Sequence, residues 1–157
     1  ILFTDINEDN IQQMKNDFPS SEFIAADAIY DTNMDIYAPC ALGATINDDT
    51  LSRLKCSIIA GAANNQLKVE DVHGRAVMDK GMIYAPDFAL NAGGVINCYS
   101  EVKGLSAEWA MNKSEQIYNT IENIIRRSQS ESVPAYMIAN KMAEERIESI
   151  SKVKLPL

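Results

Sequence analysis

The sequence predicts an α/β protein built on a doubly wound, mostly parallel sheet. Two patterns support this prediction. Over the first two thirds of the chain, short apolar stretches alternate with segments of helical periodicity, which is the rhythm of strand–helix–strand units. Over the last third, apolar residues recur at helical spacing along two long stretches. We therefore expect a parallel sheet followed by long C-terminal helices.

Several short, largely apolar stretches have the length and composition of buried strands. They are residues 1–4, 22–25, 35–38, 57–60 and 82–85. Between them, Asn7 and the acidic residues after it begin a helix that Pro19 ends, and Asn47 caps a short helix further along. Residues 69–80 have a polar helical pattern, and Gly81 stands where a glycine commonly follows a helix end.

The last third of the chain predicts two long helices. Their apolar faces consist of Ala110, Ser114, Ile117, Ile121 and Ile124 in the first, and Ala135, Ile138, Met142, Ile147 and Ile150 in the second. Pro134 suits the first turn of the second helix, because a proline there gives up no helical hydrogen bond. Since no linker separates the two parts, we expect residues 105–157 to pack back on a core formed by residues 1–104.

The composition is that of one ordinary domain with an acidic surface. The chain has 157 residues, of which 46% are hydrophobic, and a formal net charge of -8 at pH 7. This charge repels a phosphate backbone or an anionic membrane, so we expect no nucleic-acid or membrane partner. Cys40, Cys56 and Cys98 have no paired spacing and the chain has one histidine, so we expect reduced thiols and no metal site.

The start of the chain and its apolar stretches bear on cellular location. The first residues lack the charged segment and cleavage site of a secretory signal, and no apolar run approaches the ~20 residues that a membrane span needs. These features predict a cytoplasmic protein. The chain opens without methionine, directly in an apolar stretch, and we therefore expect that a further segment precedes it.

Residues with the chemistry of ligand binding follow three of the predicted strands. At a strand end, Asp5 can accept hydrogen bonds from the ribose hydroxyls of a dinucleotide, although acids also form ordinary turns there. In Ala38-Pro39-Cys40-Ala41-Leu42-Gly43, the thiol has no histidine near it in sequence, so we interpret it as a wall residue and not a nucleophile. In Ala60-Gly61-Ala62-Ala63-Asn64-Asn65-Gln66-Leu67, small residues let a flat ring approach, and the amides can pair with a carboxamide or a ribose hydroxyl. An asparagine-rich turn is the plainer interpretation of that run.

A fourth run extends from Tyr84 to Asn97 and contains Asn91 followed by the paired glycines Gly93 and Gly94. Two glycines inside an apolar segment weaken a helix unless a close approach compensates. Core packing would explain the glycines, but it explains Asn91 poorly.

Taken in order, these runs resemble the NAD-binding half of the glutamate/leucine/phenylalanine/valine dehydrogenase family, most closely its leucine and phenylalanine members. The resemblance is carried by DIYAPCALGATIND, IIAGAANNQL, GMIYAPDFALNAGGVIN and MAEERI, within residues 35–147, with Asp5 upstream. It implies that residues 1–157 are a partial NAD-binding, Rossmann-like domain that lacks its first strand and glycine-rich loop. It also implies reversible oxidative deamination of an L-amino acid to its 2-oxo acid and ammonia, with NAD taking the hydride, in a homo-oligomer.

The resemblance also assigns roles to single residues. Asp5 and Ile6 would hold the adenosine ribose. The nicotinamide-ribose side would be lined by Cys40, Ala41, Ala63, Asn64 and Asn65. Asn91 would lie where the nicotinamide meets the substrate, and Val95 and Cys98 would shape the pocket for the substrate side chain. The family's catalytic lysine and aspartate lie upstream in its other domain, so the resemblance implies no catalytic residue in this chain.

Both the substrate and the function have alternatives. We favour a branched-chain or other apolar amino acid, with an aromatic one as the close alternative, because a methylene's worth of room changes selectivity by only ~1–3 kcal/mol. A non-catalytic dinucleotide-binding regulatory module, or a purely structural assembly piece, would keep the same fold. His73 has the chemistry of a general base, but its polar helix predicts an exposed surface position.

Overall fold

The computed structural model describes residues 1–152 and confirms an α/β protein with parallel strands. The strands are β1 (Leu2–Phe3), β2 (Glu22–Phe23), β3 (Ile36–Tyr37), β4 (Ile58–Ile59) and β5 (Ile83–Tyr84). β1 pairs with β2 in one sheet, and a second sheet has the order β3-β4-β5, with parallel pairing throughout these strands. Backbone hydrogen bonds beyond the ladders lengthen the pairing, as where the Ile24 N–H donates to the Phe3 carbonyl at 2.9 Å.

Helices first alternate with the strands and then follow them. They are α1 (Glu8–Asp17), α2 (Asp48–Arg53), α3 (Glu70–Asp79), α4 (Asp87–Leu90), α5 (Gly93–Val102), α6 (Ala107–Glu131) and α7 (Ala135–Ser151), with a 3-10 turn, η1 (Ala28–Asp31). The predicted caps are confirmed, because the side chains of Asn7 and Asn47 accept backbone N–H bonds in the first turns of α1 and α2. Gly81 has a φ of 72° just past α3, a conformation that glycine tolerates at a helix end.

The main hydrophobic core joins the three-stranded sheet to helices α2 and α3. Its buried members are Tyr37, Ile46, Leu51, Leu54, Cys56, Ile59, Leu67, Val77, Tyr84 and Tyr136. Burial raises the pKa of the Cys56 thiol, because the thiolate loses its solvation there. Cys56 is therefore a packing residue, and it is a free thiol like Cys40 and Cys98.

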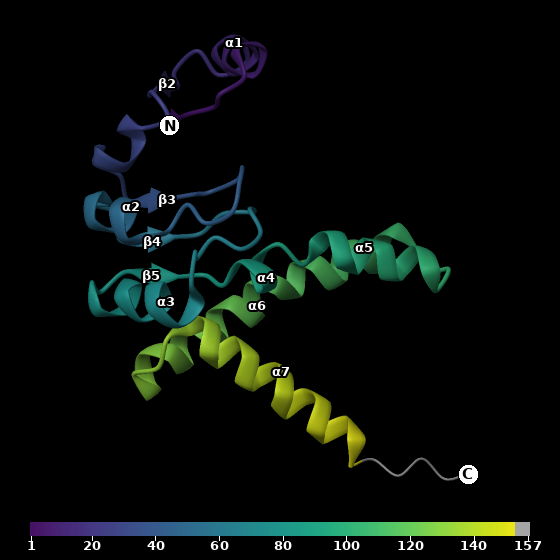
Figure 1. The fold of residues 1–157 in the computed structure, drawn as a ribbon. Coiled ribbons are helices and arrows are strands. Elements are labelled where there is room, and N and C mark those ends of the chain that lie inside the picture. The colour runs from purple at the N-terminus through teal and green to yellow at the C-terminus, as the bar shows by residue number, and fades with distance from the viewer. Residues whose placement is uncertain (153–157) are drawn as a thin grey trace.

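The two long helices pack against each other, and α6 also packs against α4 and α5. The predicted apolar face of α6 is confirmed, since all of its residues are buried or half-buried. On α7, Ile138 is fully buried, but Ile147 and Ile150 are 68% and 57% exposed, so the predicted face is wrong over the last turns. Figure 1 shows the reason, because this end of α7 extends beyond the rest of the chain.

The first turn of α7 docks on α3 around one glycine. Gly74 presents no side chain there, and a Cβ at this position would lie 2.5 Å from the Cε1 atom of the Tyr136 ring. The Tyr136 hydroxyl donates a hydrogen bond to Asp71 Oδ1 at 2.8 Å, which joins the two helices at their surface. Further along, Arg127 of α6 bonds both carboxylate oxygens of Glu145 on α7. No helix within residues 1–152 is both long and apolar enough to cross a membrane.

Candidate functional site

The loops after β3, β4 and β5 leave the sheet on one side of the molecule, as Figure 1 shows. The three strands are parallel, so their carboxyl ends share one edge, and this is where open α/β sheets bind ligands. The segments comprise residues 38–47, 60–69 and 85–92, the last of which includes α4. They hold the runs after β3 and β4 and the first part of the run from Tyr84 to Asn97. The fold therefore brings these runs to one place.

Two glycines let the first two loops approach closely. A Cβ on Gly61 would collide with the backbone of Pro39, and one on Gly43 would lie 2.7 Å from the Asn64 carbonyl oxygen. Backbone hydrogen bonds then join the loops, from the Ala63 N–H to the Pro39 carbonyl at 2.9 Å and from the Ala44 N–H to the Asn65 carbonyl at 2.7 Å. Glycine is required here because no other residue leaves room for the neighbouring backbone.

Asn64 and Asn91 meet across the second and third loops. The Asn91 side-chain amide donates to Asn64 Oδ1 at 2.5 Å and to the Ala62 carbonyl at 3.3 Å. Within the part of the chain that the structure describes, Asn91 Oδ1 and the Asn64 amide nitrogen have no hydrogen-bond partner. The pair therefore offers one free acceptor and one free donor side by side.

Two buried polar residues, Gln66 and Asp87, are joined by a hydrogen bond near these asparagines. Gln66 is fully buried, and its side-chain amide donates to the carbonyls of Gly61 at 2.6 Å and Ala63 at 2.9 Å. Its backbone N–H donates to Asp87 Oδ2 at 2.9 Å. Burial, and next the charge of Asp87, raise the pKa of the neighbouring Tyr84 hydroxyl above its ordinary range.

Asp5 lies just past β1, on the separate two-stranded sheet. Its carboxylate accepts hydrogen bonds from the Asn7 backbone N–H at 2.9 Å and from the Asn10 side chain at 3.0 Å. The bond from Asn7, followed in size by the bond from Asn10, lowers the pKa of Asp5, so the group is a carboxylate at neutral pH. Ile6 beside it is 89% exposed. Among the described residues, neither Asp5 nor Ile6 hydrogen-bonds to the asparagine pair.

The other predicted site residues differ in how far they are accessible. Cys40 and Ala41 are exposed at the first loop, whereas the Ala63 methyl group is buried, which leaves its backbone as the part that could face a ligand. Val95 and Cys98 are exposed on α5, one helical turn apart. A Cβ on Gly94 would meet nothing within 4 Å, so within this chain core packing does not explain that glycine.

The expected surface position of His73 is wrong. The side chain is buried, with 2% of the residue exposed, on the same helix as the buried Gly74 and Val77. Its Nδ1 accepts a hydrogen bond from the Val69 N–H at 2.9 Å, and its Nε2 lies 3.6 Å from Asp48 Oδ1. Among the described residues Nε2 has no hydrogen-bond partner, so the ring is held by its contact with Val69 at the start of α3.

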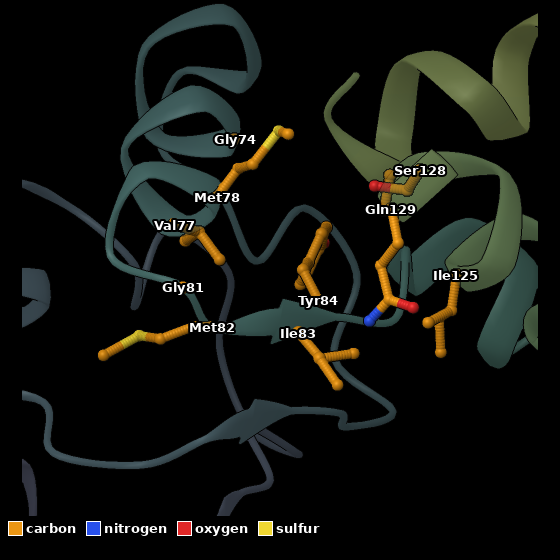
Figure 2. Close-up of a pocket in the computed structure, with 11 residues that line it drawn as sticks. Gly74, Val77, Met78, Gly81, Met82, Ile83, Tyr84, Ile125, Ser128 and Gln129 are labelled. Atoms are coloured by element: carbon orange, nitrogen blue, oxygen red, sulfur yellow. The ribbon is translucent and has the colours of Figure 1, made fainter. Parts of the chain in front are cut away.

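A cavity of about 190 Å³ lies between α3, β5 and α6, and Figure 2 shows the residues that line it. Its walls include Val77, Ile83, Tyr84 and Ile125, with the polar side chain of Gln129 at one side. None of the predicted site residues lines it. The cavity is therefore separate from the strand-end loops.

Fold and geometry together define an α/β protein with parallel strands, whose candidate ligand site lies at the carboxyl edge of the three-stranded sheet. The Glutamate/Leucine/Phenylalanine/Valine dehydrogenase family model matches residues 3–154, and the chain belongs to this family.

Three relatives show how this chain compares with family members. It is 48% identical over 154 residues to a leucine dehydrogenase of Thermoactinomyces intermedius and 50% identical over 152 residues to that of Bacillus subtilis. These matches cover 98% and 97% of this chain but 42% and 41% of the relatives, so the chain spans about two fifths of their length. The crystal structure of L-tryptophan dehydrogenase from Nostoc punctiforme matches with a TM-score of 0.92 at 36% identity, over 97% of this chain and 46% of that one.

Sequence patterns predict no role for Gln66 or Asp87, although both residues lie within the runs that follow β4 and β5. Most of their hydrogen bonds involve backbone groups, and the bond between Gln66 and Asp87 joins residues more than twenty positions apart. Helical or strand periodicity does not predict such contacts. One signal was present for Asp87, which directly follows Pro86 at the start of a helix, where an acid commonly satisfies free N–H groups.

Proposed function

We propose that this chain is the NAD-binding portion of an enzyme that converts an apolar L-amino acid to its 2-oxo acid and ammonia, reversibly. The observation that carries the proposal is the hydrogen-bonded pair of Asn64 and Asn91 at the carboxyl edge of the sheet. Its free acceptor and free donor are the complement of a carboxamide, which has one N–H donor group and one carbonyl acceptor. The carboxamide of nicotinamide is such a group.

The residues present fit two parts of the dinucleotide. The Asp5 carboxylate suits the ribose hydroxyls of adenosine, and the loops closed over Gly43 and Gly61 suit the nicotinamide end. The sequence has no Gly-x-Gly-x-x-Gly run, so the pyrophosphate cradle is not formed by this chain's residues. When bound, NAD supplies the acceptor for the substrate hydride, and the residues of this chain hold and orient it.

We further propose that the two sheets are parts of one Rossmann-like sheet. In the doubly wound order 3-2-1-4-5-6, the observed orders β2-β1 and β3-β4-β5 correspond to 3-2 and 4-5-6. A strand from elsewhere in the protein would then lie between β1 and β3. On this proposal residues 1–104 belong to the sheet core and the helices from residue 105 onward pack on it, in one partial domain; residues 153–157 of the predicted helical part lie outside the described residues.

The remaining part of the protein would complete the enzyme. The proposed acid and base, a lysine and an aspartate, would come from the other domain, and the chain alone would not catalyse. The whole enzyme is proposed to be a cytoplasmic homo-oligomer, with the small-molecule amino acid or 2-oxo acid bound between the domains.

A branched-chain substrate is favoured over an aromatic one. The relatives at 48% and 50% identity are named leucine dehydrogenases, whereas the tryptophan dehydrogenase is 36% identical. Val95 and Cys98 are exposed on α5 and available to a substrate side chain. We expect Cys98→Val in the full-length protein to shift the ratio of kcat/KM values toward smaller amino acids by roughly tenfold or less. An unaltered substrate profile would remove Cys98 from the pocket.

The proposal is tested by the formation of NADH in the full-length protein, offered aliphatic and aromatic L-amino acids and glutamate. Turnover of an aliphatic substrate supports it, and preference for an aromatic one would replace the substrate while keeping the reaction. If the protein binds NAD but turns over none of the amino acids, the non-catalytic binding module becomes the better description.

A further inference from the structure

The Asp87 carboxylate is buried at the start of α4, with 6% of the residue exposed, and each of its oxygens accepts a backbone N–H. Oδ1 accepts from Phe88 at 2.7 Å within α4, and Oδ2 accepts from Gln66 at 2.9 Å in the loop after β4. A carboxylate placed in this way joins two strand-end loops through charge-assisted hydrogen bonds, which are stronger than neutral ones.

Gln66, which Asp87 holds, in turn hydrogen-bonds to the loop that carries Asn64. Its side-chain amide donates to the Gly61 and Ala63 carbonyls, and these bonds hold the two ends of the loop together. Asn64 and Asn65 are left at the exposed tip, and Asn65 has a φ of 54°, a left-handed conformation that needs support.

Asp87 also holds the other asparagine. The Asn91 backbone N–H donates to the Asp87 carbonyl at 2.8 Å and so ends α4. The same residue therefore fixes Asn91 through its main chain and, by way of Gln66, fixes Asn64 through its side chain. The hydrogen bond of 2.5 Å between the two asparagines joins the ends of these two connections.

Neither Asp87 nor Gln66 is accessible to a ligand, because both are buried. From this we infer that Asp87 and Gln66 are positioning residues, which together set the spacing of the Asn64–Asn91 pair and so the recognition of the nicotinamide carboxamide. This inference rests on the proposed function and names the part of the cofactor that the buried pair controls.

The test compares two ligands in the full-length protein, NAD and ADP-ribose, which has the adenosine and pyrophosphate but no nicotinamide. Asp87→Asn keeps the size of the side chain but turns one acceptor into a donor that faces an N–H group. Gln66→Met keeps the volume and removes both hydrogen bonds to the loop. We expect each variant to weaken NAD binding roughly tenfold and to leave the Kd of ADP-ribose within about twofold.

Asp79→Asn is the matched control, because Asp79 is exposed on α3 and should change neither Kd. Thermal unfolding shows that each variant is folded, and Gln66→Met tests the inference if Asp87→Asn fails to fold. Equal losses for NAD and ADP-ribose, or no loss in the folded variants, would overturn the positioning role. Absence of NAD binding by the unaltered protein would instead reject the proposed function.

Discussion

At the scale of single residues, the proposed ribose site makes the charge of Asp5 a physical reason for a preference for NAD over NADP. Its pKa is lowered by two hydrogen bonds, so it is ionised at neutral pH, and it would repel a phosphate on the adenosine ribose. We expect Asp5→Ser in the full-length enzyme to reduce the preference for NAD by roughly tenfold, as expected for one unit charge near a surface. The measurement is the ratio of kcat/KM values for the two cofactors.

Asp9→Ser is the control for this prediction. Asp9 lies four residues further along, is exposed and stands in the first turn of α1, so its replacement changes the net charge by the same amount. A change of equal size in both variants, or no change in Asp5→Ser, would mean that Asp5 does not face the ribose.

Single residues also show where sequence patterns lose their predictive power. The motifs singled out Asn64 and Asn91 separately, each after a predicted strand, and the fold brings the two side chains into hydrogen-bond contact because parallel strands share one carboxyl edge. His73 was misplaced because the surrounding helix is polar, whereas the side chain is buried in the fold. The hydrogen bond between Gln66 and Asp87 was not predictable either, because it joins two loops that are far apart in the sequence.

At the scale of elements, Gly74 decides how α7 docks on α3. In a free helix, Gly→Ala is stabilising by ~1 kcal/mol. At position 74, however, the new methyl group would overlap the buried ring of Tyr136, and such overpacking costs ~1–3 kcal/mol. Gly74→Ala should therefore lower the free energy of unfolding, which chemical denaturation measures. In a Tyr136→Ala background the same change should be neutral or stabilising, and an equal loss in both backgrounds would contradict the docking.

The contact of Tyr136 with Asp71 also predicts that the free energy of unfolding falls as the pH rises into the alkaline range. Burial, and next the hydrogen bond to Asp71, raise the pKa of Tyr136 from 10.0 to about 12. The folded state therefore favours the neutral phenol. Its contribution is complete below the unfolded pKa near 10 and is lost as the pH rises toward 12. We expect the stability advantage of the unaltered protein over Tyr136→Phe to shrink across this interval. An advantage that stays constant would show that Tyr136 titrates normally.

The prediction of helices and strands succeeded where it depended on a local sequence pattern. It failed where burial depends on distant parts of the chain. The alternating strands and helices, the caps of α1 and α2 and the face of α6 follow from spacing within a few turns of chain. The last turns of α7 follow the same apolar spacing, yet Ile147 and Ile150 are exposed. Periodicity identifies a face that can be buried, but only the path of the whole helix determines whether anything lies against it.

At the scale of the whole molecule, the proposed shared sheet makes the outer edges of β1 and β3 the places where the rest of the protein joins. Within residues 1–152, each of these strands pairs on one side only, β1 with β2 and β3 with β4. Their outward N–H groups are free to exchange in this chain. A strand between them would protect both edges, because ladder amides exchange only when the pairing opens.

We therefore expect peptides covering residues 1–6 and 34–40 to exchange hydrogen markedly more slowly in the full-length protein than in the 157-residue chain. Hydrogen exchange followed by mass spectrometry measures this directly. A peptide covering residues 57–60 is the internal control, since β4 pairs on both sides and should be protected in either protein if the chain is folded. Equal exchange of the two edge peptides in both proteins, with the control peptide protected, would mean that no strand lies between β1 and β3. The two sheets would then be separate, and the Rossmann-like order would have to be abandoned.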